Sequence, residues 1–256
     1  MNSNFHISVG SAPIILHVPH SSRSIPEDVR ADLLLSDLEL ESELNEMTDF
    51  ATDLIAKAAA DSAKSKPYIF QNLLSRLVID PERFPDEREA MNKVGMGAVY
   101  LKTSDGKNLR RAGFNPQGLI EKYFDPYAKA FTELTQSILD MHGKVLIIDV
   151  HSYRVIQHPN SINHEQNRPA MCIGTDKFHT SAPLRELAIK CLSEVGDWYE
   201  NEPYSGTYVP LKFYGLEPKV QSVMMECRAD QFVDDSLQLN AGFKRVVSAL
   251  ANLIDG

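Results

Sequence analysis

The sequence predicts an α/β fold, in which a single domain holds one mixed, mostly parallel sheet flanked by helices. Short runs of aliphatic and β-branched residues, typical of buried strands, alternate with longer segments of helical periodicity. The chain has 256 residues, a length that suits one α/β domain of generous size. Its composition, 43% hydrophobic and 24% charged, is that of an ordinary globular protein. Residues 1–256 are therefore expected to form one domain.

The expected elements follow from periodicity and from proline and glycine. The strands are short apolar runs at 14–18, 66–72, 145–150, 168–174 and 220–228. Helical patterns occupy 26–35, 38–64, 115–142, 183–195 and 236–254. Pro26 is expected near the start of the first helix, Pro126 to interrupt the third, and Gly143 to end it. Residues 81–96 are expected to form a long loop, a kind of segment that is often functional.

The charge balance and the cysteine content narrow the class of partner. A net charge of −9 and a pI near 5.4 disfavour nucleic acid, because its binding proteins usually present a basic face. No apolar run approaches the length of a membrane span, so no membrane association is expected. The three cysteines form no C-x-x-C pair, which disfavours a thiolate zinc site. Free thiols without a signal peptide predict a cytoplasmic protein.

Several familiar motifs are missing. The chain has neither a P-loop pattern nor G-x-G-x-x-G, so nucleotide binding through a glycine-rich turn has no support. G-x-S-x-G is also missing, which disfavours a serine hydrolase.

Reactive side chains lie at or just after the ends of three predicted strands. They are His17 and His20 at the first, Asp149 and His151 in "IIDVHSY", and Glu226 and Arg228 in "VMMECR". Chemistry in open α/β sheets gathers beyond the carboxyl ends of the strands. A metal hydrolase needs imidazole or carboxylate ligands, an open coordination position and a carboxylate that accepts a proton from water. Two histidines and one glutamate could supply these parts.

Each of these residues also has a purely structural interpretation. His151 could be a strand-end imidazole that hydrogen-bonds Asp149. His17 lies inside its strand, which favours a structural role. Glu226 and Arg228 are two apart on one strand and therefore share a face, so they could form an ion pair.

Six fragments occur in an order that resembles the N-formylglutamate amidohydrolase family, across about residues 12–254. They are "HVPHSSRSIP", "SRLVIDPERFPDE", "GMGAVY", "IIDVHSY", "NEPYSGTYVP" and "VMMECRADQF". The resemblance implies a fold similar to that of the zinc carboxypeptidases and aspartoacylase, the phosphorylase/hydrolase-like fold. It also implies zinc-dependent (or other divalent-metal) hydrolysis of a small-molecule substrate, an N-acylated acidic amino acid, above all N-formyl-L-glutamate.

The resemblance assigns the metal ligands and the catalytic acid. His20 and His151 match the metal-binding histidines, and Glu226 matches the carboxylate that activates water. Carboxypeptidases have a glutamate ligand three residues after the first histidine, where this chain has Arg23. Asp49 is therefore the expected third ligand, because the family tends to keep an acid there. Periodicity alone places Asp49 on the solvated face of the predicted helix 38–64.

The resemblance also implies substrate-binding residues. Arg83 matches the arginine that grips the substrate carboxylate, a task that suits the planar fork of a guanidinium. Arg76 is a second candidate, although it could instead be a surface arginine paired with Asp80. Tyr204 and Gly206 belong to a loop that resembles a substrate cover, although a structural turn explains the glycine equally well.

Two positions depart from the related pattern. Glu82 stands where asparagine is common, and Ala128 stands where histidine commonly follows "PY". The alternatives are therefore a carboxypeptidase-like or aspartoacylase-like hydrolase of another N-acyl amino acid, or a non-catalytic binding protein on the same fold.

Overall fold

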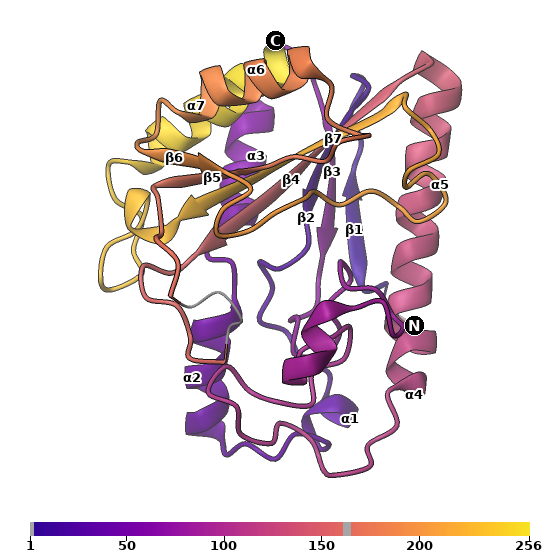
Figure 1. Cartoon of the computed structure of the whole chain (residues 1–256), viewed down its shortest axis with the longest axis vertical. Helices are drawn as coiled ribbons and strands as arrows, with labels where there is room; N and C mark the ends of the chain where they lie inside the picture. The colour runs from indigo at the N-terminus through magenta and orange to yellow at the C-terminus, as the bar shows by residue number, and fades with distance from the viewer. Residues whose placement is uncertain (1–2, 161–164) are drawn as a thin grey trace.

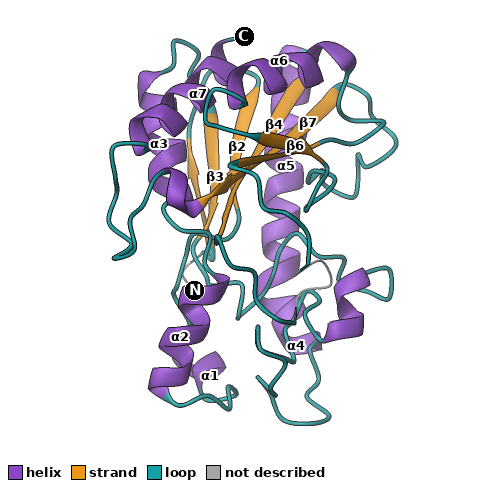
Figure 2. Ribbon diagram, turned by 60° about the vertical axis from the view of Figure 1, so that its left-hand side comes forward, coloured by secondary structure: helices purple, strands orange, loops and turns teal. Residues whose placement is uncertain are grey.

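A seven-stranded mixed sheet forms the centre of the molecule (Figures 1 and 2). The computed structural model describes residues 3–160 and 165–256. The strands are β1 (Phe5–Ser8), β2 (Ile14–Val18), β3 (Tyr68–Asn72), β4 (Val145–Tyr153), β5 (Met171–Gly174), β6 (Trp198–Glu200) and β7 (Val220–Arg228). Their order is β1-β3-β2-β4-β7-β5-β6, and only the β1/β3 and β5/β7 pairs are antiparallel. The predicted mixed, mostly parallel sheet is confirmed.

Helices cover both faces of the sheet. The α-helices of the described chain are α1 (Glu27–Arg30), α2 (Asp37–Met47), α3 (Thr52–Ser62), α4 (Gln117–Leu119), α5 (Asp125–His142), α6 (Ala182–Leu192) and α7 (Phe243–Asp255). Helices α3, α6 and α7 pack on one face, while α5 packs on the other (Figure 1). The segments that carry α1, α2 and α4 lie beyond one end of the sheet (Figure 2). No helix within the described ranges is both long and apolar enough to cross a membrane.

The alternation of side chains along β4 determines which of its residues face the site. Val145 and Ile147 belong to the core beneath α5, whereas Ile148 and Val150 belong to the core beneath α3, α6 and α7. Because side chains of a strand alternate with a period of two, the α5-facing row continues at 149 and 151. The same row reaches position 17 on β2 and position 226 on β7. The reactive side chains of three parallel strands therefore emerge on one face and at one edge.

Some predicted elements were wrong in extent. The helix expected over 38–64 is two helices, because Thr48 is extended and Ala51 has a left-handed φ of 52°. The last helix begins at Phe243 rather than 236, after a turn in which Leu237 has a φ of 59°. The short edge strands β1 and β6 lacked a strong pattern in the sequence. In each case tertiary contacts override local periodicity.

Strand β5 and the loop after β6 approach each other closely at two glycines. A Cβ atom on Gly174 would lie 2.1 Å from the carbonyl oxygen of Gly206 and 2.6 Å from the Met224 side chain. The buried Gly174 therefore lets the loop of residues 203–208 lie directly against the sheet.

We expect Gly174→Ala to lower the free energy of unfolding by about 1–3 kcal/mol, because the added methyl overpacks this contact. Gly118→Ala is the matched control, since a Cβ there meets nothing within 4 Å. Because alanine favours a helix over glycine, that variant should be unchanged or slightly stabilised. Urea unfolding of both variants tests this, and equal stability of the two would contradict the assigned contact.

Candidate active site

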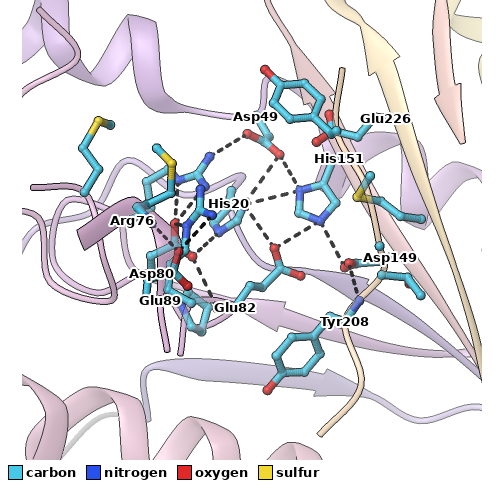
Figure 3. A pocket seen from close by; sticks show the side chains of 18 of the residues that line it. His20, Asp49, Arg76, Asp80, Glu82, Glu89, Asp149, His151, Tyr208 and Glu226 are labelled. Carbon is cyan, nitrogen blue, oxygen red and sulfur yellow. Dashed lines mark hydrogen bonds and ion pairs between the residues drawn. The ribbon is translucent and has the colours of Figure 1, made fainter. Parts of the chain in front are cut away.

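A cavity of about 1070 Å³ opens at the edge where β2, β4 and β7 end. Its centre contains His20 after β2, His151 on β4, Glu226 on β7 and Asp49 from the break between α2 and α3 (Figure 3). The predicted loop of residues 81–96 forms one wall. The structure therefore brings together all four residues proposed for metal binding and catalysis.

Three potential ligand atoms face one another. His151 Nδ1 lies 2.8 Å from Asp49 Oδ2, and His20 Nδ1 lies 3.7 Å from that oxygen. The two Nδ1 atoms are 3.4 Å apart. Ligand atoms about 2.0–2.1 Å from a tetrahedral zinc ion are about 3.3 Å from one another, so the set fits such an ion. His20, Asp49 and His151 are each less than about a tenth exposed.

The far side of each imidazole meets a carboxylate. His20 Nε2 lies 2.9 Å from Asp80 Oδ1, and His151 Nε2 lies 3.2 Å from Asp149 Oδ1. A proton on Nε2 that is shared with a carboxylate leaves the Nδ1 lone pair free for a metal. Asp80 therefore orients the His20 ring towards the shared centre through a hydrogen bond, whereas Asp149 faces His151 Nε2 only as an ion-pair partner. Sequence analysis missed this role of Asp80, because nothing in its local pattern reveals a contact 60 residues away.

Asp80 is the most heavily bonded of these acids. It is fully buried and accepts hydrogen bonds from Arg76 Nη2 at 2.8 Å and Tyr100 Oη at 2.7 Å. Burial would raise its pKa, but Arg76 and His20 outweigh burial and hold the pKa well below its ordinary value. Asp80 is therefore a permanent carboxylate that fixes His20.

The two candidate arginines differ in how many of their guanidinium donors already have a partner in the protein. Arg76 binds Asp80 through Nε and Nη2 and approaches Asp49 Oδ1 at 3.4 Å through Nη1. It pairs with Asp80 as the structural interpretation expected, but it is mostly buried rather than on the surface. Arg83 is 31% exposed and only approaches Asp80 at 3.5 Å and Glu89 at 3.7 Å. Within the described ranges its guanidinium has no hydrogen bond, so Arg83 retains donors for a ligand.

Asp149 is fixed by a second network. His17 Nδ1 lies 2.9 Å from Asp149 Oδ1, while His17 Nε2 lies 2.7 Å from Tyr127 Oη. The backbone N–H of Tyr208 donates to Asp149 Oδ2. Burial alone would lower the pKa of His17, but the carboxylates of Asp149 and Glu82 outweigh it and raise the pKa. His17 therefore acts through Asp149 rather than in the cavity.

Glu226 is nearly buried beside His151, its register partner across β4 and β7. Its Oε2 atom has no hydrogen-bond partner within the described residues. The alternative interpretation, an ion pair between Glu226 and Arg228, is wrong, because Arg228 binds Asp230 at 2.8 Å. Burial raises the pKa of Glu226 to about 8, although the charge of His151 opposes this shift. The residue is thus an uncommitted carboxyl group at the cavity.

The remaining predicted residues line the outer cavity. Tyr204 donates its hydroxyl to Gln157 at 3.2 Å. Gly206 has a φ of 84° and donates its N–H to Asn201 Oδ1, so the turn itself requires glycine. Ala128 contributes a small side chain from α5 to the wall.

Sheet and site together define an α/β protein whose candidate centre has the ligand types of a metal-dependent hydrolase. The sequence model of the N-formylglutamate amidohydrolase family matches residues 12–233. The chain therefore belongs to that family.

Two solved structures of other proteins have a similar fold. An N-formylglutamate amidohydrolase from Ralstonia eutropha JMP134 is similar with a TM-score of 0.76 and 18% identity, over 99% of this chain and 96% of that one. A gene product from Agrobacterium tumefaciens has a TM-score of 0.72 and 18% identity, over 99% and 94% of the two chains. A comparison with the curated proteins found no match.

We expect Asp80→Asn to lower the free energy of unfolding of the metal-free protein by about 3–5 kcal/mol, because it leaves Arg76 buried beside a neutral partner. Asp86→Asn is the control, since Asp86 forms an exposed ion pair with Arg88. This control should leave the free energy of unfolding nearly unchanged. Urea unfolding measures both, and a similar small effect of the two substitutions would show that Asp80 does not organise the site.

Proposed function

We propose that the protein hydrolyses the amide bond of an N-acylated acidic amino acid, with N-formyl-L-glutamate, cleaved to formate and L-glutamate, as the leading substrate. The observation that carries this proposal is the convergence of His20 Nδ1, His151 Nδ1 and Asp49 Oδ2 beside the unpartnered Glu226. Membership of the N-formylglutamate amidohydrolase family supports the same reaction class.

His20, Asp49 and His151 would hold Zn²⁺ or another divalent cation. Their separations and their mixed imidazole and carboxylate chemistry fit that ion. When bound, the cation supplies a Lewis acid for the amide carbonyl. Asp80 would keep the His20 imidazole aligned by accepting from its Nε2, while Asp149 lies 3.2 Å from His151 Nε2 as an ion-pair partner.

Glu226 is the proposed proton carrier. Its carboxylate would take a proton from the attacking water and return it to the nitrogen of the leaving amine. A group with a pKa of about 8 suits both halves of this transfer, because it gains and loses a proton near neutral pH. Its lack of a hydrogen-bond partner leaves it free for the substrate.

Arg83 is the proposed anchor for a substrate carboxylate. Its exposed guanidinium can offer two parallel hydrogen bonds to that group. Arg76 supports the site from behind through Asp80 and Asp49, so its contribution to substrate binding would be indirect. Tyr204 and Gly206 would belong to the loop that borders the bound substrate.

A longer acyl group is the second candidate for the cleaved part of the substrate. Cavities of about 300–1,000 Å³ hold drug-sized ligands, and this cavity is slightly larger than that range. Ala128 leaves additional room at the wall that α5 forms.

Formate release from N-formyl-L-glutamate tests the proposal directly. We expect activity in the zinc-loaded protein, loss after chelation and recovery after zinc is restored, because the amide carbonyl then lacks and regains its Lewis acid. N-acetyl-L-glutamate, N-acetyl-L-aspartate and a dipeptide serve as comparison substrates. Hydrolysis of the dipeptide alone would move the assignment to a peptidase, and no turnover of any substrate would refute it.

We expect Glu226→Gln to lower kcat by about 10²–10⁴-fold, because glutamine cannot accept the proton. Bound zinc, measured by elemental analysis, should persist because His20, Asp49 and His151 are intact. Full turnover in this variant would exclude the proposed role of Glu226, whereas loss of zinc would make Glu226 part of the metal site.

A further inference from the structure

Part of the wall of the active-site cavity is apolar. The centre of the cavity holds the candidate metal ligands, but its outer part contains apolar side chains that take no part in the proposed chemistry. Six of these side chains form what we call the apolar wall: Phe84, Phe124, Ala128, Val209, Leu211 and Tyr214. They come from three segments, which are the loop after β3, the N-terminal end of α5 and the loop before β7.

Helix α5 contributes one of its faces to the cavity. Phe124, which caps α5 with helical backbone angles, is followed at intervals of four residues by Ala128 and Thr132. Residues at this spacing lie on the same side of a helix, and all three line the cavity. Because the middle position is alanine, only a methyl group projects from the centre of this face.

The loop before β7 is fixed against α5 and against the polar centre. Tyr208 stacks on Phe131 of α5 with ring centres 5.5 Å apart, and Lys212 Nζ donates to Gln136 Oε1 at 2.7 Å. On its other side the backbone N–H of Tyr208 donates to Asp149 Oδ2 at 3.2 Å (Figure 3). The apolar wall is therefore continuous with the candidate metal centre.

Phe84 and Tyr214 join the loop after β3 to the loop before β7. Their ring centres are 6.5 Å apart and their planes meet at 72°, an edge-to-face arrangement that aromatic pairs prefer. Tyr214 also stacks on the buried His179, whose Nε2 accepts the N–H of Gly215. Leu211 and Tyr214 are nevertheless each 45% exposed. The wall is thus preformed, as ligand pockets usually are, and it presents apolar side chains to solvent.

We propose that the apolar wall is a subsite for an aromatic acyl group, so that substrates include N-arylacyl acidic amino acids such as N-phenylacetyl-L-glutamate. The inference rests on the proposed function and names the class of acyl group that its second candidate leaves open. Water would cleave the amide C–N bond of this substrate to give phenylacetate and L-glutamate.

The chemistry of the two halves of the substrate favours this orientation. The carboxylates of the amino acid require cationic partners such as Arg83, so they do not match an apolar wall. The acyl group has no charge and gains free energy when its apolar surface is buried. A ring can in addition make edge-to-face or offset contacts with Phe84, Phe124 and Tyr214, which a linear chain cannot.

The ratio of kcat/KM for N-phenylacetyl-L-glutamate to kcat/KM for N-acetyl-L-glutamate tests the proposal, because these amides differ only in the ring. For the zinc-loaded wild-type protein we expect a ratio of at least about ten, the lower end of the discrimination that a hydrophobic pocket gives. Ala128→Leu should lower the ratio, because the larger side chain occupies space needed by the ring. Leu211→Ala should lower it about fourfold or more, the equivalent of one methylene group of lost contact.

Leu216→Ala is the matched control. Leu216 is 74% exposed and belongs to the same loop, but it lies outside the cavity. This variant should keep the wild-type ratio. Because Leu211 is half-exposed, its replacement by alanine should not prevent folding, so the test remains decisive even if Ala128→Leu is unstable.

The outcomes separate the two proposals. If the wild-type protein cleaves N-formyl-L-glutamate alone, or if its ratio is close to one or lower, the aromatic subsite is refuted and the proposed function stands. A high ratio that neither Ala128→Leu nor Leu211→Ala lowers would place the ring elsewhere and would also refute the subsite. A protein that cleaves no N-acyl glutamate refutes both proposals.

Discussion

The contact between His20 and Asp80 is the interaction on which the rest of the site depends. Asp80 is fully buried and therefore needs positive or polar partners on every side. Arg76 and Tyr100 satisfy one side, and the His20 imidazole satisfies the other. The same carboxylate thus keeps His20 Nδ1 directed at the shared centre, and it also accepts the backbone N–H of Glu82 at 3.3 Å. The orientation of His20 and the stability of this region consequently depend on the same carboxylate.

The sheet brings residues that are distant in the sequence together at the site. Parallel β2, β4 and β7 are neighbours, and His17 is paired with Asp149 while His151 is paired with Glu226 in their registers. Because side chains alternate, one face of each strand delivers its last residues to the same edge. The α5 side of that face is aromatic, and Phe131 stacks on His17. The polar network therefore has an apolar wall behind it that excludes water.

The sequence was sufficient for the elements and residues whose signals are local. The apolar runs predicted the central strands, and strand ends predicted His20, His151 and Glu226 as neighbours. The prediction from helical periodicity that Asp49 is solvated was wrong. Asp49 is buried, and it lies in a break between two helices rather than on the face of one helix. That break depends on contacts with His20 and Ser152 that no local pattern encodes. The role of Asp80 was hidden for the same reason, since its partner is distant in the chain.

Charge balance links these observations. Asp49, Asp80, Glu82 and Asp149 bring four carboxylates to the cluster, whereas Arg76 and Arg83 bring two guanidinium groups. Carboxylates therefore outnumber guanidinium groups in this cluster, and a divalent cation would reduce the excess negative charge. Without a cation, the same negative charge acts on His151: burial would lower the pKa of His151, but Glu82 and Asp149 outweigh burial and hold it well above its ordinary value. A divalent cation and a proton on His151 are thus alternative ways to neutralise the same carboxylates, so binding of the cation should release that proton.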